Sequence, residues 1–225
     1  MRQAFRLFDT PSIRAYTKFV LSSESVIDAG LALVSAEGFS ALGVRALSAH
    51  LGVTPMALYR HVGSADQLES EVIRAIIQAM PLASSALDWP VACREWAASA
   101  RALLIRYPGA AQYIVGHWFE LTPMLVQVEA LLSAALRSGR RGFEAVAAAH
   151  HVMLYVLMRV EAETALRRAG SIKRTLREQR RSPRELPLLH EHVAHYELAR
   201  FDEHFTYGLE VLLAGQGSKP ARKSR

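Results

Sequence analysis

Apolar residues recur every three or four positions along most of the chain, which is the spacing of helices with one buried face. No stretch alternates apolar and polar residues between hairpin turns, as β-strands with one solvated face would. The pattern therefore predicts an all-α fold.

The N-terminal part predicts one longer helix followed by two short ones. Ser23 is placed to cap the first helix, and Gly38 is placed to end it. A second helix is expected over 44–50 with Gly52 behind it, after which Thr54 is placed to cap a third. Two short helices joined by a tight turn are typical of a DNA-binding helix-turn-helix.

The rest of the chain also predicts helices. A fourth is expected from Asp66 to about Met80, and the Ser, Ala and Pro residues of 81–90 are the expected joint behind it. The arginine-rich stretch 171–187 has few apolar residues and is expected to be a mobile, solvated connection. The remaining helices are predicted over residues 90–106, 109–117, 122–138, 143–169 and 195–214.

Composition favours a globular, cytoplasmic protein. Of its 225 residues 51% are hydrophobic, enough for a sizeable core, and the apolar runs are shorter than the ~18 residues of a membrane span, so no membrane partner is expected. The net charge of +6 suits a polyanionic partner, although much of the excess lies near the termini. The single cysteine, Cys93, is expected to be a small packing residue.

Four short motifs occur in order within 29–68: Ala36-Glu37-Gly38-Phe39, Val44-Arg45-Ala46-Leu47, Leu51-Gly52-Val53 and Ala57-Leu58-Tyr59-Arg60-His61-Val62. In these motifs the chain resembles the N-terminal domain of the TetR family of repressors. The resemblance implies a three-helix helix-turn-helix domain joined by a linker helix to a C-terminal helical domain that binds a ligand and dimerises. It also implies that a homodimer binds a palindromic double-stranded operator and is released by a small-molecule effector. Our hypothesis for this release is that the effector moves the fourth helix and so changes the distance between the two recognition helices of the dimer.

The domain boundaries expected on this basis are a flexible basic arm at 1–22, the helix-turn-helix domain at 23–66, the effector-binding and dimerisation domain at 67–215 and a disordered basic tail at 216–225.

The outward face of the third helix is the expected reading surface. Arg60 suits a bidentate contact to guanine, and Thr54 and Met56 suit contact with a thymine methyl. The resemblance implies phosphate contacts from Tyr59 and His61, although taken singly these could be a half-buried core tyrosine and a helix-end histidine. The full DNA-binding set is Arg45, Thr54, Pro55, Met56, Tyr59, Arg60, His61 and Ser64.

Two positions depart from the family pattern. Gly43 stands where the family usually has a Thr or Ser that caps the second helix, and Ala65 stands where it usually has a lysine. Two phosphate contacts are therefore expected to be missing. The basic residues of the arm are expected to compensate. They are Arg2, Arg6, Arg14 and Lys18.

The family resemblance implies that helices 143–169 and 195–214 form a four-helix bundle across a two-fold axis. The alternative is that their apolar stripes are ordinary core of one chain. The residues of the stripes are Val146, His150, Met153, Leu157, Phe205, Leu209, Leu212 and Leu213.

Apolar walls with a few polar groups, the usual composition of a small-molecule site, are expected between Trp89 and Met158. Each candidate residue could instead belong to the core or the interface. Glu161 and Glu163 are candidates for an ion pair with Arg159 or for orienting a charged effector. The effector-site candidates are Trp96, Tyr113, His117, Trp118, Met124, His151, Tyr155 and Arg159.

No catalytic, metal or cofactor site is expected. The histidines His190, His192 and His195 beside Glu191 suggest a metal, but on a helix only His192 and His195 share a face. The chain has no phosphate-binding glycine loop, HExxH, GxSxG or CxxC motif. The alternatives to a repressor are an adaptor of this fold without specific DNA binding and an unrecognised all-α enzyme.

Overall fold

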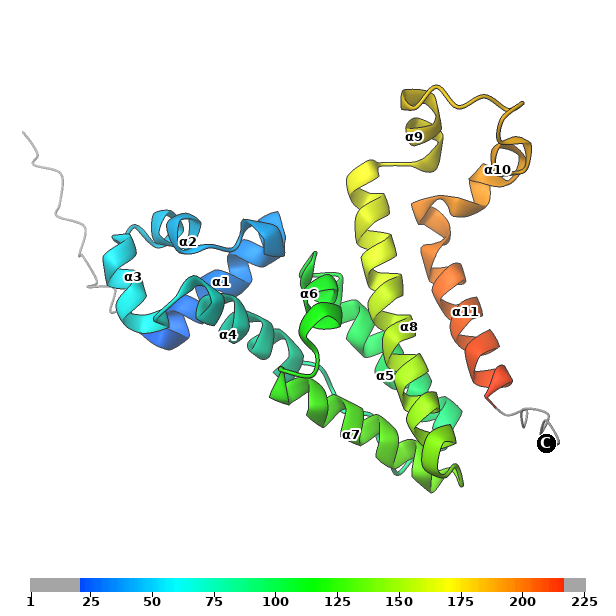
Figure 1. Ribbon diagram of the computed structural model, residues 1–225, viewed down its shortest axis with the longest axis horizontal. Helices are drawn as coiled ribbons and strands as arrows, with labels where there is room; N and C mark the ends of the chain where they lie inside the picture. Colours follow the sequence, from blue (N-terminus) through cyan, green and yellow to red (C-terminus); the bar gives the residue numbers. More distant parts are fainter. Residues whose placement is uncertain (1–20, 217–225) are drawn as a thin grey trace, which may run out of the picture.

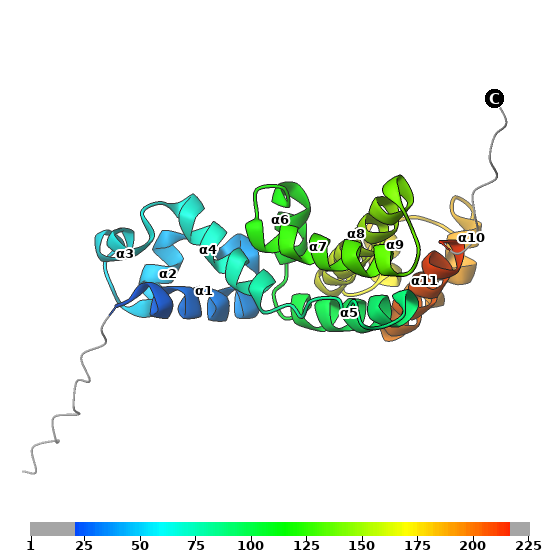
Figure 2. The same cartoon turned by 90° about the horizontal axis from the view of Figure 1, so that it is seen from below.

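A computed structural model describes residues 21–216 of the chain, and the candidate basic arm residues 2–18 lie outside them. The described part is built from helices without a strand, and it is elongated, with α1 to α3 at one end and α9 to α11 at the other (Figures 1 and 2). The α-helices are α1 (Ser23–Glu37), α2 (Val44–Leu51), α3 (Pro55–Val62), α4 (Ala65–Gln78), α5 (Trp89–Leu104), α6 (Ala110–His117), α7 (Thr122–Arg137), α8 (Gly142–Ala169), α9 (Ile172–Glu178), α10 (Pro187–His192) and α11 (Phe201–Gly215).

Local capping explains where the N-terminal helices begin. Ser22, not Ser23, caps α1. Its hydroxyl oxygen accepts from the backbone N–H of Ser25, and the hydroxyl oxygen of Ser25 accepts from the backbone N–H of Ser22. Gly38 ends α1 as predicted. A short 3-10 turn, η1 (Phe39–Ala41), follows and carries the buried Phe39.

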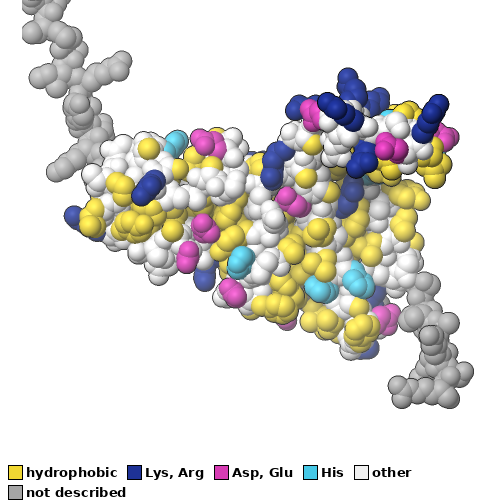
Figure 3. All heavy atoms as spheres, turned by 45° about the horizontal axis from the view of Figure 1, so that its top comes forward, with side chains coloured by type: hydrophobic (Ala, Val, Ile, Leu, Met, Phe, Trp, Pro, Cys, Tyr) yellow, Lys and Arg dark blue, Asp and Glu magenta, His cyan; other side chains and the backbone are white. Residues whose placement is uncertain are grey.

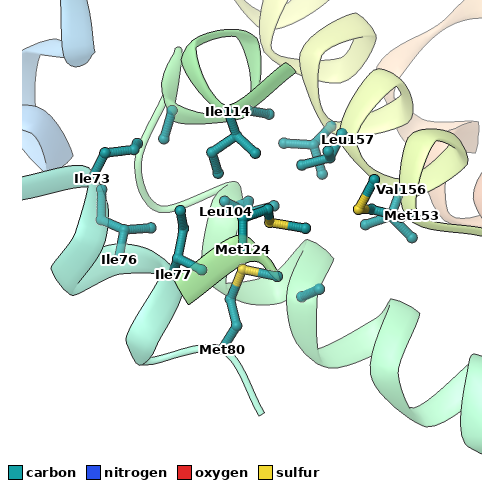
Figure 4. Packing of buried hydrophobic residues seen from close by; sticks show 14 of the residues in the cluster. Ile73, Ile76, Ile77, Met80, Leu104, Ile114, Met124, Met153, Val156 and Leu157 are labelled. Carbon is teal, nitrogen blue, oxygen red and sulfur yellow. The ribbon is translucent and has the colours of Figure 1, made fainter. Parts of the chain in front are cut away.

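Helix α4 belongs to both parts of the molecule. Its first half packs closely on α1, where a Cβ added at Gly30 would lie 2.6 Å from Cγ2 of Val72. Its second half points into the C-terminal bundle, and Figure 4 shows Ile73, Ile76 and Ile77 facing side chains of α5, α6 and α7. The buried side chains of the DNA-binding helices and of the C-terminal bundle therefore form one continuous core. The buried residues Leu166, Leu176, Val193 and Phe201 lie outside this core.

The long helix α8 lies at the centre of the C-terminal bundle and packs against α5, α6, α7 and α11. By length and composition it could cross a membrane, with a mean hydropathy of 1.2 over 18 residues. Of that window 44% is buried inside the fold, and a single helix of this kind is weak evidence for a membrane span, because core helices of globular proteins meet the same criteria.

Two predicted segments differ from the structure. The first part of the stretch 171–187 is not an irregular connection, since Ser171 caps α9 and Leu176 anchors this helix in a buried position. Residues 179–186 do form a mainly exposed, non-helical connection to α10. The last long helix begins at Phe201 rather than near residue 195. The residues before it form two 3-10 turns, η2 (Val193–Tyr196) and η3 (Leu198–Arg200), with extended backbone at Glu197 between them.

Cys93 is fully buried on α5, and this burial raises the pKa of its thiol to about 12. The folded protein therefore keeps the thiol protonated, whereas the unfolded chain ionises near the ordinary value of about 9, so stability present at neutral pH is lost as the pH rises from about 9 towards 12. We expect iodoacetamide to label Cys93 in the unfolded protein but only very slowly in the native protein at pH 8, as measured by intact mass. Rapid labelling of the native protein would contradict this burial.

Candidate nucleic-acid interface and effector region

The turn between α2 and α3 is held by backbone geometry. Gly52 takes a left-handed conformation with φ of 67°, which favours glycine, and the Val53 N–H donates to the Ser48 carbonyl at 3.0 Å. Leu47 and Leu58 are fully buried, and they fix the inner faces of the two helices. The helix-turn-helix predicted from the sequence is therefore present, with α3 as its second helix.

The outer face of α3 is exposed. Met56 is 69% exposed and Tyr59 is 43% exposed, so Tyr59 is not a core tyrosine. Arg60 is exposed one position further along the helix. Thr54 caps α3 by accepting from the Ala57 N–H at 3.2 Å, which leaves its hydroxyl hydrogen available to a further acceptor. These side chains, with Pro55 in the first turn, form an exposed surface of the kind that can enter a major groove.

The other DNA-binding candidates lie around this surface. Arg45 is exposed in the first turn of α2, and Ser64 caps α4 by accepting from the Gln67 N–H at 3.1 Å. His61 is exposed at the end of α3, where it lines a hollow of about 300 Å³ beside Ile27. Ser64 therefore has a structural role as the cap of α4. The other backbone N–H groups in the first turn of α4 can donate to an anion such as a phosphate.

The departure at Gly43 has a visible consequence. Gly43 is the N-cap of α2 and supplies no side-chain hydrogen bond, whereas Thr54 and Ser64 cap the two following helices. Ala65 is exposed at the start of α4. Neither residue has a side chain that can donate a hydrogen bond to a phosphate.

In the C-terminal bundle, Trp96 is fully buried and takes part in a polar chain. Its indole Nε1–H donates to Oε1 of Gln127 at 2.9 Å, and Nε2 of Gln127 donates to the Met80 carbonyl at 3.0 Å. This chain joins α5 and α7 to the residues that end α4. Gln127 was not singled out from the sequence, although a polar residue in the otherwise apolar stripe of α7 is a signal that could have identified it.

Two other effector-site candidates lie beside the N-terminal domain. Tyr113 of α6 packs on Phe39 of η1 with ring centroids 4.8 Å apart, and it stacks on His117 at 4.3 Å. The Phe39 N–H donates to the Pro108 carbonyl at 2.7 Å. The loop before α6 therefore contacts the helix-turn-helix domain directly.

The remaining candidates lie apart from one another. Met124 is fully buried in the core shown in Figure 4, and Trp118 lies against His150 with ring centroids 5.3 Å apart. His151 is exposed on α8. Tyr155 donates its hydroxyl to the Phe205 carbonyl at 2.8 Å, and burial raises the pKa of this phenol. The structure thus does not bring the eight candidates together around one cavity.

The residues proposed for the dimer face differ in burial. Met153, Leu157, Phe205, Leu209 and Leu213 are buried within the chain, so for them the ordinary core alternative is correct. Val146 is exposed, and His150 and Leu212 are partly buried. The large apolar side chains that are exposed on α8 and α11 form a set that shares only Val146 with the predicted one. It comprises Phe143, Val146, Met158, Tyr207 and Val211.

The charged residues of α8 have separate partners. Glu163 is buried and accepts from Arg101 of α5 at 2.8 Å and from Arg167 at 2.6 Å. Arg101 also pairs with Asp202 of α11 at 2.7 Å, so the guanidinium of Arg101 connects α5, α8 and α11. Glu161 lies 3.6 Å from Arg168. Neither glutamate pairs with Arg159.

The histidine-rich segment does not form a metal site among residues 21–216. No group of three or more potential ligands is gathered anywhere in that range. His190 contacts the Arg181 carbonyl at 3.1 Å, and the rings of His192 and His195 lie 6.2 Å apart.

Comparisons with known proteins agree with this architecture. A family described as bacterial regulatory proteins of the tetR family matches residues 26–72, and one described as the tetracyclin repressor-like C-terminal domain matches residues 81–218. No curated protein sequence matches the chain.

Solved structures of similar fold cover nearly the whole chain. A possible TetR family transcriptional regulator from Streptomyces coelicolor A3(2) is 22% identical, with 86% of this chain and 98% of that chain covered and a TM-score of 0.74. ActR from Streptomyces coelicolor, in complex with actinorhodin, is 19% identical, with coverages of 91% and 99% and a TM-score of 0.71. BioQ with its double-stranded DNA operator is 23% identical, with coverages of 89% and 100% and a TM-score of 0.63.

The two family matches together span the helix-turn-helix and most of the C-terminal bundle. The chain therefore belongs to the TetR family of bacterial regulatory proteins.

Proposed function

We propose that the protein is a ligand-responsive transcriptional repressor that binds a near-palindromic operator as a homodimer and leaves it when a small-molecule effector binds. The observation that carries this function is the exposed outer face of α3, where Tyr59 and Arg60 project from a helix whose inner face is locked by Leu58. In this role the chain needs no catalytic step and no cofactor, and it works in the cytoplasm, where its operator lies.

Dimerisation is proposed to use the outward apolar side chains of α8 and α11. Phe143 is 87% exposed and Tyr207 is 73% exposed, which is unusual for large apolar side chains unless a partner covers them. A dimer also places two copies of α3 against two half-sites, because one helix-turn-helix contacts too little DNA for tight specific binding.

Effector binding in the C-terminal bundle is proposed to reach the DNA-binding domain through two contacts. One is the hydrogen bond from Gln127 to the Met80 carbonyl at the end of α4, and the other is the packing of Tyr113 on Phe39. A ligand that displaces Trp96 or Tyr113 would shift α4 or η1 and change the separation of the recognition helices. ActR in complex with actinorhodin and BioQ with its operator provide support by analogy within the fold.

The test is to incubate the purified protein with a pool of random duplexes at physiological salt and to sequence the retained fragments. A near-palindromic site is expected. Retention of no particular sequence at any salt concentration would contradict specific operator binding and favour an adaptor that has lost it.

Arg60→Ala is expected to weaken binding to that site by roughly 10- to 100-fold, because a bidentate contact to guanine contributes about 1–3 kcal/mol of discrimination. Tyr59→Ala is expected to weaken binding to all sequences alike, as loss of a phosphate contact does. Arg137→Ala is the matched control, since it removes one exposed positive charge at the far end of α7. Fluorescence anisotropy with labelled duplex measures all three variants, and an Arg60→Ala protein that binds like the control would exclude Arg60 from base contact.

A further inference from the structure

A cavity of about 250 Å³ lies at the C-terminal half of α8, away from the core between α5 and α8. Its walls are the aromatic rings of Tyr196 and Phe201 and the aliphatic side chains of Leu166 and Ile172. The guanidinium of Arg159 and the ring of His204 complete the lining. The volume is just below the roughly 300–1,000 Å³ of drug-sized ligands, so the cavity suits a fragment with one ring.

Arg159 has no counter-ion in the structure. It makes no ion pair with any carboxylate among residues 21–216, and its Nε is shielded from solvent with no hydrogen-bond partner. The guanidinium carbon lies 5.2 Å from the centroid of the Phe201 ring. A planar guanidinium can contact an aromatic ring with its face and still donate its N–H groups to an oxygen ligand. A shielded N–H without a partner costs free energy, and an anion in the cavity would remove that cost.

The other arginines at this end of α8 are paired. Arg101 and Arg167 share the buried carboxylate of Glu163, and Arg168 lies 3.6 Å from Glu161. The positive charge of Arg159 is therefore not compensated by any acidic side chain of its own helix.

The segment that follows the cavity wall at Ile172 carries an excess of basic side chains, although Arg174 pairs with Glu178 and Arg181 with Glu185. Ile172, one of its wall residues, begins α9, and the exposed lysine and arginine side chains of α9 and the following loop gather over this end of the molecule (Figure 3). Such a cluster attracts anions and raises their local concentration. Its members are Lys173, Arg174, Arg177, Arg180, Arg181 and Arg184.

We propose that this cavity binds a small organic anion, with an aromatic or branched apolar body between Tyr196, Phe201 and Leu166 and a carboxylate paired with Arg159. The site goes beyond the proposed function, because its occupation requires neither DNA nor a particular effector in the bundle core. It also explains why an arginine is kept half-buried on a mainly apolar helix.

The experiment titrates the full-length protein with 4-fluorobenzoate and, separately, with 4-fluorobenzamide, and follows both by fluorine NMR. The two probes have nearly the same shape and differ in charge. We expect the benzoate to bind about tenfold or more tightly than the benzamide, because a charge-assisted hydrogen bond to a shielded arginine contributes more than a neutral one.

Arg159→Gln is expected to abolish this preference for the anion, and Arg159→Lys to keep part of it. Arg137→Gln, which removes an exposed arginine at the end of α7 and outside the basic cluster, is the control and is expected to retain the preference. Circular dichroism confirms that each variant is folded. Equal binding of the two probes by the unaltered protein, or an undiminished preference in the folded Arg159→Gln protein, would overturn the proposal, and neither result depends on operator binding.

Discussion

Gln127→Leu is expected to lower the free energy of unfolding by about 2–6 kcal/mol, because it leaves two buried groups without partners at about 1–3 kcal/mol each. The groups are the indole N–H of Trp96 and the carbonyl of Met80, which the Gln127 side chain now joins. Urea unfolding followed by circular dichroism measures the change, with protein concentration held constant since a dimer's stability depends on it.

The same substitution is expected to alter effector response without altering the operator sequence. Release of the Met80 carbonyl loosens the end of α4 while α3 keeps its exposed face. Trp96→Phe is the second variant of the comparison, because it removes the indole N–H but leaves the hydrogen bond from Gln127 to the Met80 carbonyl in place. Two substitutions that act on one chain of hydrogen bonds should not be additive in the double variant. Additive effects would show that Trp96 and Met80 are not coupled through Gln127.

Glu163→Leu is expected to lower the free energy of unfolding by about 3–5 kcal/mol, because removal of one partner from a buried ion pair leaves an uncompensated charge. Here that charge is the guanidinium of Arg101, whose side chain is only 16% exposed. The second partner, Asp202, is 88% exposed and so compensates weakly. Thermal and urea unfolding both measure the loss.

Two further variants separate charge burial from simple loss of contacts. Arg101→Met combined with Glu163→Leu is expected to recover most of the lost stability, because apolar side chains of similar size replace a buried pair well. Glu178→Gln, which removes an exposed ion pair with Arg174 on α9, is expected to change stability far less than Glu163→Leu, because solvent screens an exposed pair. A double variant no more stable than Glu163→Leu alone would show that the charge of Arg101 is not the cause.

Sequence reasoning located the helices of the DNA-binding domain closely because their ends depend on neighbouring residues. Gly38, Gly52 and Thr54 act within one turn of their own positions, and the structure places the helix ends there. The exposed face of α3 followed from the same local pattern, since burial of Leu58 and Val62 leaves Met56 and Tyr59 outside. The fold class and the family could be predicted for the same reason.

The C-terminal domain was harder to predict because its critical contacts join distant residues. A stripe of apolar side chains shows that Met153 is covered, but not whether α11 of the same chain or a partner covers it. The bond from Trp96 to Gln127 and the ion pair from Arg101 to Glu163 depend on how helices cross. Spacing along one helix carries no information about such crossings, which is why the effector-site candidates proved scattered.

The position of α4 in a shared core also bears on how such regulators can be recombined. Ile73, Ile76 and Ile77 in the second half of α4 pack against α5, α6 and α7 (Figure 4). Because protein cores are closely packed, the shapes of these side chains are matched to this particular bundle. A chimera that joins another regulator's operator specificity to this bundle would need its junction before Ile73, so that the second half of α4 travels with α5 to α8. The η1 contact with the Pro108 loop would then have to be matched across the new junction. A DNA-binding domain can therefore be exchanged only with one whose first three helices pack on both the retained half of α4 and the loop at Pro108.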